Sequence, residues 1–437
     1  MGRFGVRSRM IRYCCTALVA CLCVISSLGQ SSRPSAVSPR YSEAFETIWT
    51  DIDHNFFDPS FLGVNWADVK TRYQAQLSEI HDDDGFKVLI DKMLHELPTS
   101  HLHFRVATAS KTMTPSTRIG VLSREIGGED VVVSVEPASD AAMKGVRLGD
   151  VLLTKEEMLR GPWGSSVEVE VKHCNQKVEK YTLVREPFGW PYERPSVQWK
   201  IYRRSAKMKF GYLRIVHFED DVAPLIDEAM QEMVGTAGII VDLRDNTGGN
   251  ASYVRLMSYL SPTPRVAFVL LDRPFLNRFG RAPEKLDNEL LAKIPRVTGA
   301  YTTEAILEAF KTNGGGAAFY TEDVGKDAHP GKVILLVNHE TASAAEGFAW
   351  DIKGWPQVTV IGQETSGTIA GAEDFDIPGG WTLTLPTHAA WGPDGSMYRD
   401  RTTIPDRVVP ETRAMLCSGK DAAMEAATEI LLKAESH

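Results

Sequence analysis

Cysteine is scarce in this 437-residue chain, and most of it lies near one end. Four of the six cysteines fall within the first 29 residues, which leaves Cys174 and Cys417. Two cysteines so far apart give no disulfide framework, although one bond between them is conceivable in an oxidising compartment. No Cys/His spacing matches a metal site, and we expect no metal or other cofactor.

The chain also lacks an apolar run long enough to form a membrane-spanning helix. The stretch Cys14 to Leu28 is apolar or small but falls short of the roughly 20 residues needed. Four arginines precede it, and Ser27-Leu-Gly29 at its end offers a small-residue cleavage site, which is typical of a secretory signal peptide. We therefore expect residues 1–29 to be removed and the mature chain to be extracytoplasmic, with no membrane span. Leu18-Val-Ala-Cys21 resembles a lipobox, so a lipid anchor on Cys21 is the alternative.

Basic residues are outnumbered: the chain has 48 against 57 acidic ones, a net charge of −9. Removal of residues 1–29 takes away four arginines and no acids, which leaves 44 basic and 57 acidic residues, or −13. So acidic a body argues against nucleic acid as a partner. The length allows about two to three domains, each able to bury a core.

A serine stands where a strand-like run gives way to a helical one. Val333 to Val337 is apolar, and a helix is predicted to begin near Ser343. At such a junction the hydroxyl lies beside the positive end of the helix dipole, and the Ala344 N–H can donate to an oxyanion. The alternative is a capping box, Ser343-Ala-Ala-Glu346, in which serine and glutamate only cap the helix. By spacing alone the capping box is the commoner arrangement.

Two other segments carry polar or glycine residues at the ends of predicted elements. Thr236 to Asn250 reads as a buried strand that ends in an Asp/Asn/Gly turn, where Gly248 and Gly249 let a backbone approach a ligand. The alternative is a tight turn that needs positive φ. Farther upstream, an amphipathic helical stretch ends with Ser100 and His101 side by side. A histidine alone is usually a surface or satisfied core residue.

The coarse pattern predicts a multidomain α/β protein. Residues 30–39 form a Ser/Pro-rich linker, and 40–112 read as a helical region. Short strands dominate 113–190, whereas strands and helices alternate over 191–437. That alternation predicts an α/β core with a mainly parallel sheet, with the candidate residues at the carboxyl ends of strands.

Taken together, these motifs resemble the serine peptidase family that contains the tail-specific (C-terminal processing) peptidases and the tricorn protease core. The resemblance covers nearly the whole mature chain and is carried by Ala44 to Asp58, Val64 to Asp68, Leu97 to His101, Asp242 to Gly249, Thr341 to Glu346, Gly362 to Gly367 and Ile404 to Asp406. Several short motifs in the right order are far more specific than any one of them. The resemblance implies that Ser343 is a nucleophile.

One departure from the family pattern bears on the mechanism. The tail-specific peptidases activate their serine with a lysine about two dozen residues downstream, but Val358 to Ala370 contains none here. Lys353 comes too early, within the predicted helix. The segment Glu96 to His101 instead resembles the tricorn core, which implies His101 as general base and Ser100 as its orienting partner. Neutral imidazole suits this role because its reference pKa is about 6.5. His103 is the alternative base.

The remaining site assignments rest on the same resemblance. The oxyanion hole would combine the Ala344 N–H with that of Gly248 or Gly249. The tricorn type also uses a glutamate shortly before its Pro-Asp motif, and here Asp400 is the nearest acidic residue, one residue out of the usual spacing.

The strand-rich region from Arg118 to Arg185 resembles a PDZ domain. Val131 to Leu153 contains a strand, a short helix, a Gly-Asp turn and a second strand in that order. PDZ domains bind a peptide C-terminus as an added strand and hold its carboxylate with backbone amides. By this match Ile119-Gly120-Val121 would be the carboxylate loop. The alternative is a small β-domain used only for packing.

The sequence therefore predicts a secreted serine peptidase that cleaves peptides or flexible polypeptides, near their C-termini, through an acyl-enzyme on Ser343. Two other functions remain open. One is a catalytically inactive extracytoplasmic peptide-binding protein of the same fold, suggested by the missing lysine and glutamate. The other is a different acyl hydrolase that uses the same serine. Neither the substrate sequence nor the oligomeric state follows from the sequence.

Overall fold

The structure is a computed structural model that describes residues 38–105, 116–186, 195–204, 209–369, 371–399 and 402–434. The predicted signal peptide, the alternative lipid anchor at Cys21, most of the predicted linker and Asp400 lie outside these residues. Among the described residues, no helix is both long enough and apolar enough to cross a membrane.

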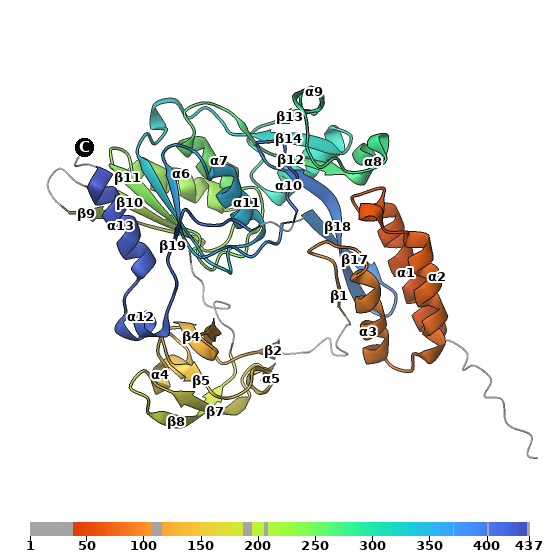
Figure 1. Cartoon of the computed structure of the whole chain (residues 1–437), viewed down its shortest axis with the longest axis horizontal. Helices are drawn as coiled ribbons and strands as arrows, with labels where there is room; N and C mark the ends of the chain where they lie inside the picture. Colours follow the sequence, from red (N-terminus) through yellow and green to blue (C-terminus); the bar gives the residue numbers. More distant parts are fainter. Residues whose placement is uncertain are drawn as a thin grey trace, which may run out of the picture. The chain divides into compact units, whose positions relative to one another are not determined.

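Three helices form the N-terminal region, in agreement with the helical prediction. They are α1 (Pro39–Asn55), α2 (Trp66–Gln74) and α3 (Asp83–Leu94), with the short 3-10 helices η1 (Phe61–Gly63) and η2 (Ala75–Glu79) between them. Proline occupies the first turn of α1, and Asp82 caps α3 by accepting from the Gly85 N–H at 2.7 Å. The predicted region also contains a strand, β1 (His103–Arg105). The helices lie together in Figure 1.

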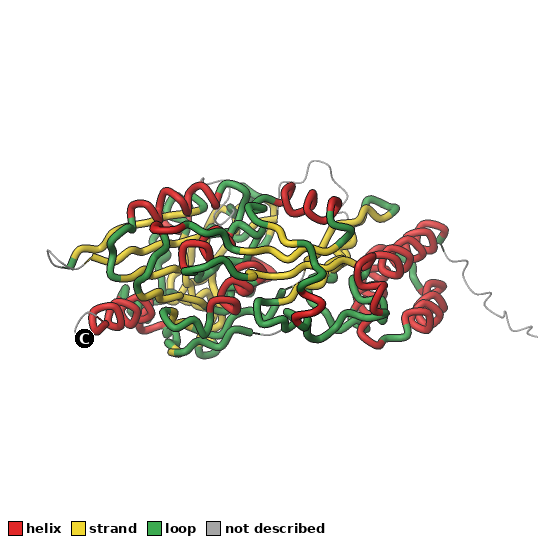
Figure 2. Tube along the Cα trace, turned by 90° about the horizontal axis from the view of Figure 1, so that it is seen from above, coloured by secondary structure: helices red, strands yellow, loops and turns green. Residues whose placement is uncertain are grey.

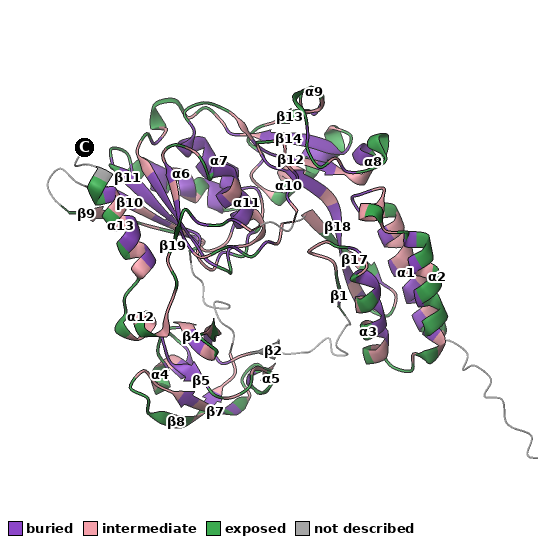
Figure 3. Cartoon of the chain, viewed as in Figure 1, coloured by how far each residue is buried: buried purple, intermediate pink, exposed green. Residues whose placement is uncertain are grey.

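The main sheet of the core has the strand order β19-β16-β15-β11-β10-β9. Its strands are β9 (Val197–Arg203), β10 (Lys209–Ile215), β11 (Gly238–Asp242), β15 (Lys332–Val337), β16 (Val358–Gly362) and β19 (Arg407–Val408). All neighbours pair in parallel except β9 with β10, so the predicted mainly parallel sheet is confirmed. Figure 3 shows β10 and β11 largely buried.

Helices cover both faces of this sheet, and Figure 2 shows helices on both sides of the strands. One face packs on α6 (Val222–Glu232), α7 (Tyr253–Leu260) and α11 (Ser343–Ile352), where Leu335 and Val337 meet Phe348. The other face packs on α13 (Ala422–Ala434), where Ile334 and Leu336 meet Leu431. This alternation follows from the period of two along each strand.

A second sheet has the order β1-β18-β12-β14-β13, with β17 also paired to β18. Its further strands are β12 (Val266–Asp272), β13 (Arg296–Val297), β14 (Gly316–Tyr320), β17 (Gly371–Ile377) and β18 (Trp381–Trp391). The run at 266–271, predicted as part of the main alternation, is instead β12 and pairs antiparallel. Because the rings of Phe86, Phe104 and Trp381 pack against one another in edge-on and tilted arrangements, the N-terminal helices share a core with this sheet.

Short helices decorate the core sheets and the C-terminal segment. They are α8 (Arg273–Leu276), η3 (Asn277–Phe279), α9 (Asn288–Leu291), α10 (Thr303–Thr312), η4 (Gly325–Asp327) and α12 (Arg413–Ser418). Side-chain caps mark several of their starts; Thr302, for example, accepts from the Ala305 N–H at 3.2 Å.

Residues 116–186 form a small β-domain with a core of its own. Its sheet has the order β3-β4-β5-β7-β8, and β2 pairs with β6. The elements are β2 (Ser116–Thr117), β3 (Val121–Ile126), β4 (Glu129–Val135), α4 (Asp140–Lys144), β5 (Val151–Leu152), α5 (Glu156–Leu159), β6 (Gly161–Pro162), β7 (Ser166–Lys172) and β8 (Val178–Val184). Strand, short helix and strand follow in the predicted order. A disulfide between Cys174 and Cys417 links this domain to α12.

Candidate active site

Ser343 opens helix α11 with a backbone conformation that few non-glycine residues adopt. Its φ is +50°, and the preceding Ala342 is the N-cap, with no side-chain cap. Its N–H donates to the Thr368 carbonyl at 2.9 Å, and no described residue hydrogen-bonds its hydroxyl. The Glu346 side chain turns away to the backbone of Gly367 and Thr368. The capping-box interpretation is therefore wrong, because neither of its two side-chain bonds is formed.

The predicted glycine turn lies directly against this serine. A Cβ placed on Gly248 would lie 2.6 Å from Ser343 Cβ and 2.9 Å from the Ala344 nitrogen. A Cβ on Gly249 would lie 1.8 Å from the Phe218 carbonyl oxygen. Both glycines also have positive φ, +106° and +127°, so the turn needs them for conformation as well as for clearance.

The N–H groups of the two glycines differ in their availability. Gly248 is buried, and its N–H donates to Asn246 Oδ1 at 2.8 Å. Gly249 is exposed, and among the described residues its N–H has no acceptor. Ala344 lies in the first turn of α11, where N–H groups lack intrahelical partners. The Ala344 and Gly249 N–H groups are thus the two that remain for a ligand.

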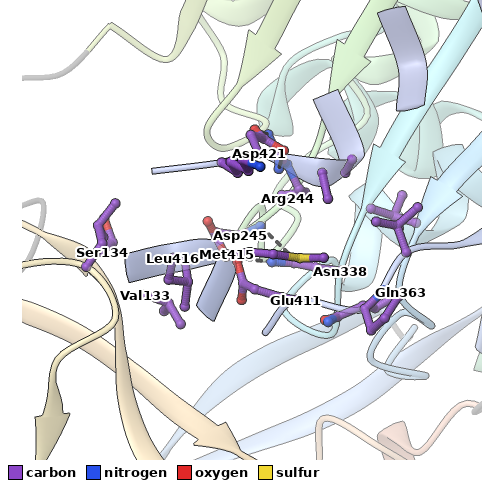
Figure 4. Close-up of a pocket in the computed structure, with 18 of the residues that line it drawn as sticks. Val133, Ser134, Arg244, Asp245, Asn338, Gln363, Glu411, Met415, Leu416 and Asp421 are labelled. Atoms are coloured by element: carbon purple, nitrogen blue, oxygen red, sulfur yellow. Dashed lines mark hydrogen bonds and ion pairs between the residues drawn. The ribbon is translucent and has the colours of Figure 1, made fainter. Parts of the chain in front are cut away.

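Hydrogen bonds tie the glycine turn to the segment that leads into Ser343. Thr341 Oγ1 donates to the Leu243 carbonyl at 2.9 Å, and the Ala342 N–H donates to the Asn246 carbonyl at 3.0 Å. The Asp245 N–H donates to Asn338 Oδ1 at 2.9 Å, and Asn338 Nδ2 returns a bond to Asp245 Oδ1 at 2.7 Å, drawn in Figure 4. Two turns nearly a hundred residues apart are therefore held in one register.

A cavity of about 490 Å³ lies beside Asp245 and Asn338 (Figure 4), but its lining includes neither Ser343 nor His101. Arg244 and Asp421 line its wall and form an ion pair at 2.8 Å, and Arg244 also contacts the buried Asp242 at 2.7 Å. Burial opposes ionisation of Asp242, but the positive charges of Arg244 and Arg214 outweigh it and lower the pKa of this carboxyl. These residues act as orienting ion pairs at the strand ends.

His101 lies in a bend between α3 and β1. Its φ is +60°, and its Nδ1 is 3.2 Å from Ser100 Oγ, as expected for a histidine with an adjacent orienting hydroxyl. His103 is the first residue of β1, is exposed, and pairs opposite Thr384 of β18. Because His101 lies in the bend before the strand, the two rings do not share one extended segment.

The segments that carry the other candidate residues converge. A small cavity of about 20 Å³ is lined by Thr99, Ile369 and Arg399, among others. These residues are close in sequence to Ser100, to Thr368, which accepts from the Ser343 N–H, and to Asp400. The bend that contains His101 thus borders the loop that holds Ser343.

Lys353 lies at the opposite end of the serine helix. It is the C-cap of α11, and its Nζ donates to the Ile404 carbonyl. With a rise of 1.5 Å per residue, the ten residues of the helix separate it from Ser343 by about 15 Å along the axis. Lys353 therefore cannot take a proton from this serine.

The predicted carboxylate loop of the β-domain is closely packed. The side chains of Ile119 and Val121 are buried, and the Gly120 N–H donates to the Glu186 carbonyl at 3.0 Å. A bound carboxylate would have to replace that acceptor. A role of Ile119, Gly120 and Val121 in substrate binding stays a prediction.

Sequence reasoning missed the residues that hold the site together. Glu346 was noted only as part of a cap, and Asn246, Asn338 and Thr341 were not singled out. Asn246 and Thr341 are fully buried polar residues, and such residues are rare unless they form hydrogen bonds. Polar residues in turns that directly follow buried strands were the available signal.

Comparison with known proteins agrees with this geometry. The family model described as Peptidase family S41 matches residues 209–409, and that of the Tricorn protease C1 domain matches residues 39–95. Carboxyl-terminal-processing peptidase 2 of Arabidopsis thaliana is 23% identical over 431 residues, 92% of this chain and 75% of the relative. A tricorn protease homologue of Streptomyces coelicolor is 23% identical over 385 residues, 80% of this chain and 28% of the relative.

Solved structures share the fold. The photosystem II D1 C-terminal processing protease superimposes with a TM-score of 0.56 at 20% identity, covering 89% of this chain and 99% of that protein. The tricorn protease superimposes with a TM-score of 0.51 at 16% identity, covering 91% of this chain and 37% of that protein. By its family matches and its relatives, this chain is a serine peptidase whose residues 209–409 match family S41, and its fold is similar to those of the C-terminal processing peptidases and the tricorn protease.

Proposed function

We propose that the protein is a secreted peptidase that acylates on Ser343 and cleaves peptides or flexible polypeptides near their C-termini. The observation that carries the proposal is the environment of Ser343. Its hydroxyl, at the start of α11 and next to the Ala344 N–H, has no hydrogen-bond partner among the described residues, and Gly248 supplies the clearance. Backbone N–H groups at a helix N-terminus favour the negative charge that develops in acyl transfer.

The residues of this site can perform each step of the reaction. His101 accepts the proton of the Ser343 hydroxyl as its oxygen attacks the peptide carbonyl, and the Ser100 hydroxyl orients the imidazole ring. The Ala344 and Gly249 N–H groups hold the oxyanion. His101 then gives its proton to the leaving amine, and water releases the acyl group by the same steps in reverse. Asp400 stays a prediction for the acidic partner.

The preference for C-termini is proposed from two sources. Similar proteins are named as C-terminal processing peptidases. In addition, β3 forms one edge of the described β-domain sheet, and such an edge can accept an extended peptide as a further strand. A signal peptide over residues 1–29 accounts for secretion.

Labelling with a fluorophosphonate tests the nucleophile. Wild type should be labelled and should hydrolyse a flexible peptide, whereas Ser343→Ala should lose both while keeping its melting temperature. The expected loss in turnover is several orders of magnitude, since triad knockouts reach about 10⁶. Activity of a folded Ser343→Ala protein near the wild-type level would overturn the assignment.

The base and the reaction class need their own comparisons. His101→Ala should lose most turnover and Ser100→Ala part of it, while His103→Ala and Lys353→Ala, matched controls outside the proposed machinery, should change it little. The acid limb of kcat/KM should fall between about pH 5 and 8, where unperturbed imidazole titrates. Absence of labelling would favour a peptide-binding protein without catalysis. Turnover of esters but not of peptides would favour a different acyl hydrolase.

A further inference from the structure

Glu346 is a buried carboxylate one helical turn after Ser343. None of its surface is exposed. Burial raises its pKa, although hydrogen bonds from Thr365, Gly367 and Thr368 act in the opposite direction. A carboxyl group taken so far out of water is costly unless its oxygens are bonded, so its partners show what it does.

Three of those partners belong to the loop at 365–368. The Gly367 N–H donates to Glu346 Oε1 at 2.8 Å, and the Thr368 N–H donates to Oε2 at 2.9 Å. The Thr365 hydroxyl also donates to Oε1. Thr365 is further fixed by the Thr403 N–H, which donates to its Oγ1 at 2.7 Å. One carboxylate thus accepts hydrogen bonds from three residues of a loop that has no regular secondary structure.

The same loop holds Ser343 in place. The Thr368 carbonyl accepts the Ser343 N–H at 2.9 Å, and this closes a ring from the serine through the first turn of α11 to Glu346 and back through Thr368. Ser343 has φ +50°, a strained conformation for a non-glycine residue that persists only where its surroundings impose it. The ring is such a constraint.

We propose that Glu346 is a positioning residue: through Thr368 it fixes the backbone of Ser343, and so aims the hydroxyl and leaves the Ala344 N–H free for the oxyanion. This inference rests on the proposed function, with Ser343 as nucleophile. It assigns Glu346 no contact with substrate and no proton transfer. Its effect is therefore on the rate of acylation and not on substrate affinity.

Glu346→Gln is the direct test. The amide can keep an acceptor for Thr365 and Gly367, but its NH₂ group then faces the Thr368 N–H and breaks that bond. Since a misplacement of about 1 Å can cost about 100-fold in rate, kcat and the fluorophosphonate labelling rate should each fall about 10- to 100-fold, with KM within about twofold. Hydrogen exchange at the Ser343 amide should accelerate, because its acceptor is no longer held.

Asp351→Asn is the matched control. Asp351 is also a buried carboxylate of α11, but it accepts from Tyr398 and does not touch the 365–368 loop. This variant should keep the labelling rate and the Ser343 exchange rate of wild type, whatever its melting temperature. Thr365→Val gives a second, milder perturbation, with an expected fall of about 3- to 10-fold, and Thr365→Ser should restore the rate.

The outcomes separate the two proposals. The positioning role is overturned if Glu346→Gln is labelled at a rate within twofold of that of Asp351→Asn and if hydrogen exchange at its Ser343 amide is as slow as in wild type. If Glu346→Gln does not fold, unchanged labelling in Thr365→Val does the same. If wild type is not labelled at all, the proposed function fails, while faster Ser343 exchange in Glu346→Gln would still support the structural link.

Discussion

Gly248→Ala should inactivate the enzyme by crowding the oxyanion site beside Ser343, without replacing any atom of the nucleophile itself. The added methyl would lie 2.6 Å from Ser343 Cβ, 2.9 Å from the Ala344 nitrogen and 2.9 Å from the Ala342 carbonyl oxygen. Two of these three neighbours are backbone atoms, which cannot move aside as the end of a flexible side chain can. The Ala344 N–H would then be covered or displaced.

Two free-energy terms contribute and can be separated. Alanine at φ +106° costs about 1–3 kcal/mol in conformational strain, and this term lowers stability. Loss of one oxyanion donor costs about 2.7–4 kcal/mol in the transition state, and this term lowers kcat by about 100- to 1000-fold. Only the second term depends on the position of Gly248 beside Ser343.

Gly354→Ala is the control for the first term. Gly354 follows the same helix, has φ +90°, and an added Cβ would meet nothing within 4 Å. It should lose a similar amount of stability and keep full kcat. Peptide turnover, labelling rate and thermal melting of both variants form the assay. If Gly248→Ala retains the kcat of Gly354→Ala, Ala344 is not an oxyanion donor in the way described.

Three further predictions concern other parts of the molecule. Replacing Cys174 and Cys417 by serine should cost about 2–4 kcal/mol of stability, measured by denaturant unfolding. Reductant should lower the melting temperature of wild type but not of this variant, and an equal response of the two proteins would contradict the prediction. Burial raises the pKa of Asp351 well above its usual range. Its contribution to the free energy of unfolding is therefore present at low pH and is lost as the pH rises through the raised pKa. Wild type should therefore lose stability relative to Asp351→Asn as the pH rises above the usual aspartate range, and a stability difference that is constant with pH would refute this. Amidating the C-terminus of a peptide substrate should weaken cleavage if the β-domain binds a free carboxylate; equal cleavage would favour a packing role.

Local patterns in the sequence were enough to predict the two turns of the site. The start of α11 follows from an apolar strand, small residues and a helical run, and the glycine turn follows from a buried strand that ends in Asp/Asn/Gly. In each case the signal lies within about fifteen residues. The choice between cap and nucleophile at Ser343 was not local, because it depends on where Glu346 finds its partners.

Contacts between distant segments could not be predicted in this way. Asn338 meets Asp245 across 93 residues, and Thr341 meets Leu243 across 98. Nothing in the spacing of either turn selects the other. The placement of the run at 266–271 in the main parallel sheet was wrong for the same reason, because a run of apolar residues does not specify which neighbour it pairs with.

The missing lysine changes what the loop after α11 can contribute. In the tail-specific peptidases this stretch is expected to supply the base, whereas here its backbone carbonyl at Thr368 holds the Ser343 N–H and its own N–H groups are held by Glu346. Lys353 cannot substitute, because the length of α11 separates it from Ser343. The proton acceptor must therefore come from another segment. The bend at His101 borders this loop through Thr99 and Ile369, and its imidazole already has an orienting hydroxyl in Ser100. If His101 is the base, as we propose, this histidine and the loop held by Glu346 act together, and losing either should slow acylation without weakening substrate binding.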